Sequence, residues 1–389
     1  MSTATAEHRT FQRSRLTWVA YAVLAWFAYL QAAPGLVIPH LRDELDLSYA
    51  TGGLLVASFA AGSMLAGALA ARLERTLGRR RLLWSATAVL AGGTVGLTAA
   101  PSAALTVASV LFMGTGGGLL LVVVQALLLD HHGERSPVAL AEANVGASAS
   151  YVVLIGALSL TAALNGSWRL ALLASLAVPL LTWSANRRLP IEAPAPSDVV
   201  SGRLPGVFWV AAGMLVCAVA AEWCIAGWGA TFVQDVVQVS ADTAVLVMAG
   251  YFGGVLAGRL VGSRLARRYD PAHLLAVALA VAGLGFFVLW PATTTTQAVL
   301  GLALLGVGLG NLFPMAISVT VALAPGQSAL ASGRAVFVTS FAVLLAPLTV
   351  GALADATSLK AALGVVPVVL VLAGAGLALV QRARIRGRD

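Results

Sequence analysis

Apolar runs of about 20 residues recur along the whole of this chain, and each is long enough to cross a membrane. At about 1.5 Å per residue, a helix of that length spans a hydrocarbon layer of about 30 Å. Hydrophobic residues make up 59% of the 389 residues and charged residues only 10%, against about 25% charged in soluble domains. The sequence therefore predicts an all-α polytopic membrane protein and excludes a water-soluble enzyme.

Hydropathy predicts twelve membrane helices in two sets of six. We expect them at residues 16–39, 50–72, 82–100, 103–129, 138–164, 169–186, 206–231, 243–265, 272–290, 296–323, 329–353 and 361–380. A polar, proline-rich stretch, 187–205, separates the sixth helix from the seventh. It predicts a linker between an N-terminal six-helix bundle, 1–186, and a C-terminal bundle with a basic tail, 206–389.

Basic residues predict which side of the membrane each connection occupies. Most of the 24 Lys and Arg residues precede the first predicted helix, lie in the even-numbered connections, or follow the last helix. The odd-numbered connections carry only Arg42, Arg169 and Lys360. Under the positive-inside rule both termini are expected in the cytoplasm. The net charge of +8 therefore indicates topology, and nucleic-acid binding is disfavoured.

The two predicted halves repeat each other at an offset of 192 residues. The matching positions are Ser58, Gly62, Ala66 and Ala70 with Gly250, Gly254, Gly258 and Gly262, and Gly114, Gly116 and Gly118 with Gly306, Gly308 and Gly310. Parallel six-helix repeats, related by an axis along the membrane normal, are described for one large class of transporters. Small residues at spacing four let helices approach and slide, so we expect the stripes on helices 2 and 8 to serve the gates.

A resemblance to the major facilitator superfamily extends over essentially the full length. Between helices 2 and 3, the stretches 67–72 (GALAAR) and 78–81 (GRRR) are similar to the family's Gly-x-Leu-x-Asp-Arg-x-Gly-Arg-Arg signature, with Ala71 at the acidic position. Residues 222–228 and 308–314 are similar to fucose-permease-like bacterial branches. The resemblance implies alternating access, with helices 1, 4, 7 and 10 around the cavity. It also implies that helix 2 packs on helix 11, and helix 8 on helix 5, across the domain interface.

Four polar side chains on those cavity helices are predicted at one depth. Counting from the cytoplasmic ends places Gln31, Thr115, Glu222 and Asn311 roughly 18–24 Å up a core of about 30 Å. Glu222 is the only carboxylate well inside a predicted span, and an ionised acid there costs several kcal/mol. It is therefore our candidate proton site, the alternative being a protonated side chain that hydrogen-bonds a neighbouring helix.

The remaining candidates would hold the solute or bend the helices. Amides such as Gln31 and Asn311 suit a hydroxylated or amide-bearing solute, or alternatively packing between helices. Tyr29 and Trp223 are expected as aromatic walls, with Thr115 as a further contact. Pro34 and Pro314 each remove a backbone donor, freeing the carbonyls of the residues four positions earlier, and would form gating bends or static kinks.

Two charge pairs are candidate cytoplasmic latches of the outward-open state. Glu142 would meet Arg259, and Arg334 would meet Glu74; the alternative is that these side chains extend to lipid headgroups. Arg334 has a second possible role as an anchor for a substrate carboxylate. Asp130, His131 and His132 could suggest a metal site, but we expect a solvated loop.

These observations favour a monomeric, proton-coupled secondary transporter that moves a small organic solute across the inner membrane of a bacterium. Residues 146–156 lack the proline of the family's drug/proton antiporters, which disfavours that branch. Symport is our expectation, and the direction of transport stays open. The chain has no nucleotide-binding Gly-x4-Gly-Lys-Ser/Thr loop, and we expect neither a cofactor nor a metal. Expected partners are the solute, protons and membrane lipids. An organic-anion or drug exporter, and a non-transporting receptor or lipid-interacting scaffold, stay open as alternatives.

Overall fold

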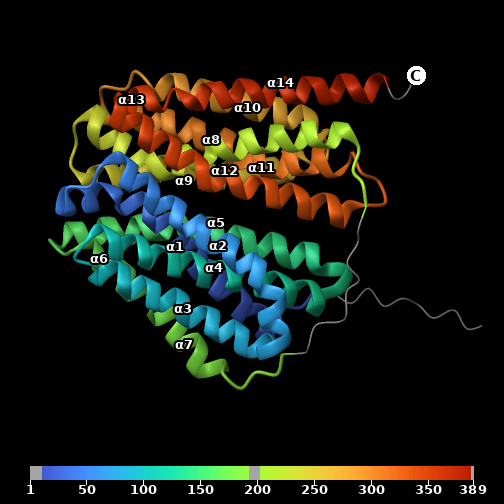
Figure 1. Cartoon of the computed structure of the whole chain (residues 1–389), viewed down its shortest axis with the longest axis horizontal. Helices are drawn as coiled ribbons and strands as arrows, with labels where there is room; N and C mark the ends of the chain where they lie inside the picture. The colour runs from blue at the N-terminus through green and yellow to red at the C-terminus, as the bar shows by residue number, and fades with distance from the viewer. Residues whose placement is uncertain (1–10, 192–201, 387–389) are drawn as a thin grey trace, which may run out of the picture.

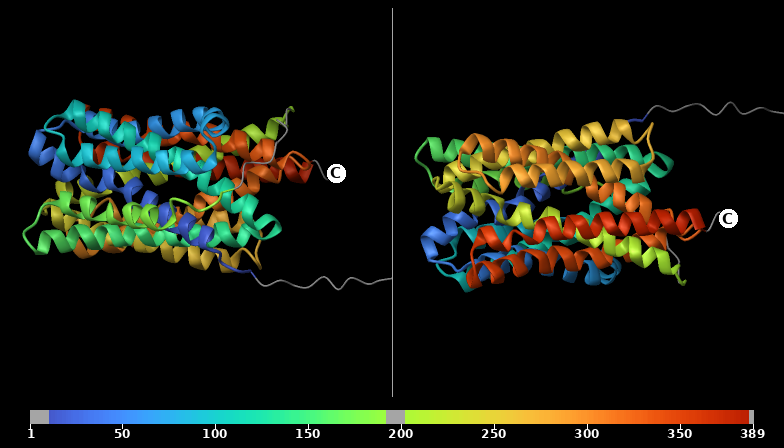
Figure 2. Two further views of the ribbon diagram at one scale, coloured as in Figure 1. Left: turned by 90° about the horizontal axis from the view of Figure 1, so that it is seen from below. Right: turned by 90° about the horizontal axis from the view of Figure 1, so that it is seen from above.

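The computed structural model describes residues 11–191 and 202–386, and in these ranges every regular element is a helix. Arg9 and Arg388, two of the arginines that predict the orientation, lie outside the described residues, as does the middle of the predicted linker. The helices form two bundles that lie side by side and run along one axis (Figures 1 and 2).

Each bundle is a continuous stretch of the chain (Figure 1). The first contains α1 (Arg15–Leu45), α2 (Tyr49–Leu77), α3 (Arg79–Ala99), α4 (Ala103–His132), the 3-10 turn η1 (Gly133–Arg135), α5 (Ser136–Ala163), α6 (Trp168–Ser175) and α7 (Ala177–Asn186). The second contains α8 (Gly206–Val237), α9 (Ala241–Leu265), α10 (Pro271–Leu289), α11 (Thr295–Val321), α12 (Ser328–Ala356), α13 (Leu359–Ala362) and α14 (Val365–Arg386). We call them the N-half and the C-half.

Eleven helical stretches of the described residues are long and apolar enough to cross a membrane. One of them, Ala103–Ala163, is 61 residues long and includes α4, η1 and α5. The predicted helix 169–186 is divided at Leu176 into α6 and α7. The polytopic all-α fold is thus observed, whereas the count of twelve crossings and the cytoplasmic position of the termini stay predictions.

Local sequence signals begin and end the corresponding helices of the two halves in the same way. Ser48 and Ser240 cap α2 and α9 by accepting a hydrogen bond from the backbone N–H three residues later. Such a cap stabilises a helix by about 1 kcal/mol. Asp46 and Gln238 end α1 and α8 in the left-handed conformation, with φ of 51° and 59°. Both pairs of residues differ by 192 in number, the offset predicted from the sequence.

The same offset recurs in the close approach of helices inside each half. In the N-half, Gly114 of α4 lies against the carbonyl oxygen of Phe59 of α2, and in the C-half Gly306 of α11 lies against that of Tyr251 of α9. A Cβ atom at either glycine would overlap the facing backbone. Only glycine permits these two seams, α2 against α4 and α9 against α11.

The small-residue stripes belong to these seams, which corrects their predicted role in gating. Gly62 faces the backbone of α4, and Gly254, Gly258 and Gly262 face α11. The halves meet along α1 with α8, α2 with α12, and α5 with α9, so the predicted helix pairing is observed. The stripes therefore fix helices within a half, and other faces of α2 and α9 form the interface between the halves.

Candidate functional site

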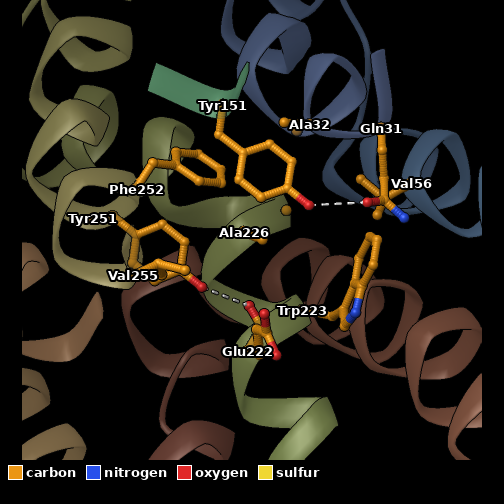
Figure 3. Close-up of a pocket in the computed structure, with 12 residues that line it drawn as sticks. Gln31, Ala32, Val56, Tyr151, Glu222, Trp223, Ala226, Tyr251, Phe252 and Val255 are labelled. Atoms are coloured by element: carbon orange, nitrogen blue, oxygen red, sulfur yellow. Dashed lines mark hydrogen bonds between the residues drawn. The ribbon is translucent and has the colours of Figure 1, made fainter. Parts of the chain in front are cut away.

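A small cavity lies between the two halves, and both contribute to its walls (Figure 3). Its volume is about 50 Å³, so in this state it offers little free space to a solute. The lining residues are Gln31, Ala32, Gly35 and Val56 of α1 and α2, Tyr151 of α5, Glu222, Trp223, Ala226 and Gly227 of α8, and Tyr251, Phe252 and Val255 of α9. The pocket is aromatic and apolar, with few polar groups.

Glu222 faces an arginine that sequence reasoning assigned to a different partner. Nη2 of Arg259 lies 3.7 Å from Oε1 of Glu222, and the two side chains are 30% and 20% exposed. Arg259 also donates from Nη1 to the Ser148 hydroxyl at 2.7 Å, across the interface between the halves. The guanidinium thus connects α9 with α8 and with α5 of the N-half.

The third contact of Arg259 is with a backbone carbonyl that Pro314 leaves free. Its Nε donates to the carbonyl oxygen of Gly310 at 3.4 Å. That carbonyl has no intrahelical donor because Pro314, four residues on, lacks an N–H. Pro314 itself is exposed, and α11 continues through it, as α1 continues through the buried Pro34. Pro314 therefore supplies an acceptor beside the site.

Two tyrosines and a glutamine complete the polar groups around the pocket (Figure 3). The Tyr151 hydroxyl donates to the Gln31 side-chain oxygen at 3.1 Å, within the N-half. The Tyr251 hydroxyl donates to the backbone carbonyl of Glu222 at 3.4 Å, within the C-half. The Tyr151 ring also lies 5.1 Å from that of Phe252, so aromatic contact joins the halves at the pocket.

Of the six residues predicted at the site, the structure brings Glu222, Gln31 and Trp223 together and leaves three elsewhere. Tyr29 is buried in the N-half, where its hydroxyl donates to the carbonyl of Ala171 at 2.8 Å. Thr115 donates to the carbonyl one turn earlier in α4 and lies in the α2–α4 seam. The structure does not place these two side chains in the pocket.

Asn311 likewise lies in a seam, between α11 and α9. Its Nδ2 donates to the Val307 carbonyl at 3.1 Å, and its amide group faces Gly258 and Gly262. The side-chain oxygen is buried without a hydrogen-bond partner among the described residues. Equal depth along the helices was therefore insufficient, because the Thr115 hydroxyl bonds its own helix and the Asn311 amide faces α9 of its own half.

Sequence reasoning missed Arg259, Tyr151 and Tyr251 as lining or facing groups of this pocket. Arg259 lies only six residues before the end of α9, so its Cα position indicated the helix end. Its long side chain instead extends away from that end, to Ser148 and Glu222. The available signal was an arginine on the same helix as two consecutive aromatic residues, Tyr251 and Phe252, two turns away.

Neither predicted latch is present in this structure. Glu142 binds Arg13 at 2.6 Å and accepts from the Tyr21 hydroxyl at 3.0 Å, all within the N-half. The Glu142 carboxylate raises the pKa of the Arg13 guanidinium above its ordinary value. These contacts replace the expected pair with Arg259, which lies closer to the middle of the bundle.

The two residues of the second predicted latch have other partners in this state. Glu74 binds Arg79 at 2.5 Å, and the same arginine binds Asp130 at 2.5 Å. Arg334 donates to the Gly202 carbonyl at 3.0 Å, next to the beginning of α8. The side chains of Arg334 and Glu74 therefore have other partners, and neither lines the pocket.

The end of the molecule that holds Arg15, Arg79 and Arg384 differs sharply from the other end; we call them the basic end and the opposite end. At the opposite end, polar contacts join the halves in several places. They are His40–Asp242 at 2.8 Å, Gln234–Asp43 at 3.1 Å, Tyr49–Asp235 at 2.6 Å, and Asp355 with the backbone N–H groups of Tyr49 and Ala50 at 2.8 Å each.

Close backbone contacts accompany these bonds. A Cβ on Gly53 would meet the Pro347 carbonyl of α12, and a Cβ on Gly35 would meet the Ala226 carbonyl of α8. On the basic-end side of the Ser148–Arg259 bond, no hydrogen bond or ion pair joins the halves in residues 11–191 and 202–386. In the part of the chain that the structure describes, the polar contacts between the halves therefore run from the pocket to the opposite end.

The histidines predicted to belong to a solvated loop instead contact α1 and the residue before it. Nε2 of His131 lies 2.8 Å from the Ser14 hydroxyl, and Nε2 of His132 lies 2.9 Å from that of Thr17. Among the described residues, no group of three or more His, Cys, Asp or Glu side chains is arranged to hold a metal ion.

Comparisons with known proteins agree with this architecture. The model of the Major Facilitator Superfamily matches residues 17–211 and 211–388. An uncharacterized MFS-type transporter of Yersinia pestis is 25% identical over 354 residues, which cover 89% of this chain and 91% of that protein. Membrane protein MosC of Rhizobium meliloti is 25% identical over 293 residues, 72% of this chain and 69% of that protein.

Solved structures share the fold at low sequence identity. A crystal structure of a bacterial homologue of the human lysosomal transporter Spinster, inward-facing and occupied, matches with a TM-score of 0.76 at 16% identity and covers 96% of this chain and 98% of its own. The inward-facing, unoccupied structure of such a homologue matches with a TM-score of 0.74 at 16% identity, and covers 97% and 99%.

Proposed function

The chain belongs to the major facilitator superfamily, and from that premise we propose that this secondary transporter couples the movement of a small organic solute to a proton bound at Glu222. Its family and fold are those of transporters and not of enzymes. The observation that carries the proposal is a carboxylate beside an arginine in a pocket between two halves that are fastened at one end.

The two ends of the interface support an alternating-access cycle. Contacts between the halves hold the opposite end closed, while the basic end lacks such bonds in the described residues. With the arginines placed in the cytoplasm by the positive-inside rule, this conformation opens inward. Rocking of the halves about the pocket would break the contacts at the opposite end and expose Glu222 to the other side.

Glu222 suits proton coupling because rocking of the halves would change its access to water while Arg259 stays beside it. In this state its side chain is 20% exposed and its charged partner is Arg259. An ionised carboxylate inside a membrane protein needs such a partner or water, and otherwise takes up a proton. Gln31, Tyr151 and Trp223 are the proposed solute contacts, since they line the same pocket. Import by symport is the direction we propose, across the inner membrane of a bacterium.

The test is proton movement in vesicles containing purified protein and a pH-sensitive dye. A panel of small acids, amides, amines and sugars is added to wild type, to Glu222→Gln and to Glu134→Gln, an exposed glutamate of η1 that serves as the control. We expect one solute class to drive proton flux in wild type and Glu134→Gln and to lose that flux in Glu222→Gln. Equal flux in all three proteins would exclude Glu222 as the proton site.

A further inference from the structure

We propose that the pocket recognises the anionic group of an organic monoanion, a carboxylate or a sulfonate, which binds to Arg259 in place of Glu222. The inference deepens the proposed function and rests on it in one respect, because it takes Glu222 as the group that accepts the proton. It moves the anion anchor from Arg334, near the basic end, to Arg259, whose guanidinium contacts a residue that lines the pocket.

The contacts of Arg259 leave some of its N–H donors free for an anion. A guanidinium carries five N–H donors and forms its strongest bonds with an acid group that accepts two of them. Here the neutral Ser148 hydroxyl accepts one at 2.7 Å and the Gly310 carbonyl another at 3.4 Å. The Glu222 oxygen lies at 3.7 Å, beyond hydrogen-bond distance. Glu222 thus balances the charge of Arg259 but leaves N–H donors of the guanidinium without an acceptor.

The walls of the pocket specify the rest of the solute. Trp223, Phe252 and Val255 present apolar surface, and Gln31 with Tyr151 presents one amide and one hydroxyl. Such a lining binds an apolar or aromatic body and offers it few hydrogen bonds. A small aromatic or branched acid matches this combination better than a sugar, whose many hydroxyls would be left unpaired.

Charge balance then links the anion to the proton. The charged and titratable side chains that face Glu222 are Arg259 and Tyr251 of α9 and Tyr151 of α5, while α1 contributes the uncharged Gln31. The empty pocket is neutral as a Glu222–Arg259 ion pair. It is neutral again when Glu222 holds a proton and Arg259 holds the anion.

The half-loaded states are the costly ones. A proton without the anion leaves Arg259 unpaired, and the anion without a proton leaves two negative groups beside one arginine. An uncompensated charge in such a site is strongly destabilising. The fully loaded and empty carriers are therefore the forms that change conformation readily. The consequence is one proton carried with each monoanion, and no net charge moved across the membrane.

Binding measurements on purified protein test the site directly. The probes are benzenesulfonate, which stays ionised, its neutral match benzenesulfonamide, and the cation benzyltrimethylammonium. We expect benzenesulfonate to bind best to wild type and at least about tenfold more weakly to Arg259→Gln, with partial recovery in Arg259→Lys. Arg334→Gln is the control, and should bind like wild type because Arg334 donates to the Gly202 carbonyl and is not among the residues that line the pocket.

Several results would overturn the assignment. These are preference for the amide or the cation, no binding of benzenesulfonate at up to millimolar concentrations, or a loss in Arg334→Gln that Arg259→Gln does not show. A folded Arg259→Gln protein is confirmed by an unchanged melting temperature without ligand. If Arg259→Gln does not fold, Arg259→Lys alone decides, through weaker binding of the anion and unchanged binding of the amide.

Uptake in vesicles separates this inference from the proposed function. Benzenesulfonate uptake should rise with an acidic outside and stay the same when the membrane potential is set to zero or inside-negative with potassium and valinomycin. A neutral solute that drives Glu222-dependent proton flux and ignores Arg259→Gln would leave the proton site standing and remove the anion site. Anion uptake with unchanged pH dependence in Glu222→Gln would remove the proton site and leave the anion site standing.

Discussion

The two halves share their packing and differ in their charges. The seam contacts of Gly114 with Phe59 and of Gly306 with Tyr251 are copies at an offset of 192 residues. At the same offset, Glu222 corresponds to Leu30 and Arg259 to Gly67. The two halves therefore share a scaffold, but only the C-half has the Glu222–Arg259 pair at these positions.

This difference bears on how a rocking carrier would work. Glu222 and Arg259 belong to α8 and α9 of one half, so movement between the halves leaves their spacing intact. The Ser148–Arg259 bond and the Tyr151–Phe252 contact cross the interface and must change. In the proposed cycle, the C-half carries the charges and the N-half exposes or covers them.

The largest effect should follow from placing the acid in the other half. Leu30 is 0% exposed, and the position that corresponds to Arg259 is a glycine. Leu30→Glu would bury a carboxyl group without a cationic partner, which costs about 3–5 kcal/mol and lowers the melting temperature by on the order of 10 °C.

Leu30→Met keeps the volume and is the matched control, measured by thermal unfolding of both variants in the same detergent. Equal melting temperatures for the two variants would mean that the N-half tolerates an acid at this depth. Protein stability would then not explain why the N-half has no acid at the position that corresponds to Glu222.

The next effect tests whether the seams are equivalent. Gly114→Val and Gly306→Val should destabilise the protein by similar amounts, about 1–3 kcal/mol each, because the facing atoms are backbone and cannot rotate away. Gly67→Val and Gly253→Val on α2 and α9 are controls, since a Cβ there meets nothing within 4 Å. Melting temperatures that fall for only one seam would contradict the equivalence of the halves.

The fold could be predicted from the sequence because it depends on patterns that extend over many residues. Apolar runs, the spacing of small residues and the offset of 192 all involve many positions, so errors at single residues matter little. The small residues of α2 and α9 were predicted to let helices approach closely, and they do so in the seams. Their partner helix was not predicted correctly, because a stripe of small residues permits close approach without specifying which neighbouring helix approaches.

The site was only partly accessible, for reasons of side-chain length and direction. Depth along a helix placed Gln31 and Glu222 at one level, and both line the pocket. Depth along a helix does not give the direction of a side chain around the helix axis. The Asn311 amide faces a seam instead, and the Thr115 hydroxyl bonds a backbone carbonyl of its own helix. Arg259 was assigned to a helix end from its Cα position, whereas its side chain extends to Glu222.

A smaller effect should appear at the opposite end, where Asp355 of the C-half caps α2 of the N-half. Its carboxylate accepts from the first two N–H groups of α2, the role that a residue of the same helix normally fills. Asp355→Ala should remove about 0.5–2 kcal/mol from the closed opposite end, a shift of several-fold in the conformational equilibrium.

The readout is labelling of a Thr231→Cys reporter, which lies one turn beyond Gly227 on α8 and is fully buried here. A membrane-impermeant maleimide added from the opposite side should react several-fold faster after Asp355→Ala. Asp270→Ala is the control, because Asp270 caps α10 within its own half. Equal labelling in both backgrounds would show that the cap does not hold the halves together.

The smallest effect concerns Glu142, whose ion pair lies within the N-half and near the basic end. Because this pair is partly exposed and does not cross the interface, Glu142→Gln and Arg13→Gln should resemble each other and transport within about twofold of wild type. Uptake of the same solute in vesicles measures both. If Glu142→Gln alone slowed transport, Glu142 would have a partner in another conformation that Arg13 does not replace, and Arg259 on the facing helix α9 would be the first to test. That result would restore the predicted latch and give the N-half a charge that acts across the interface.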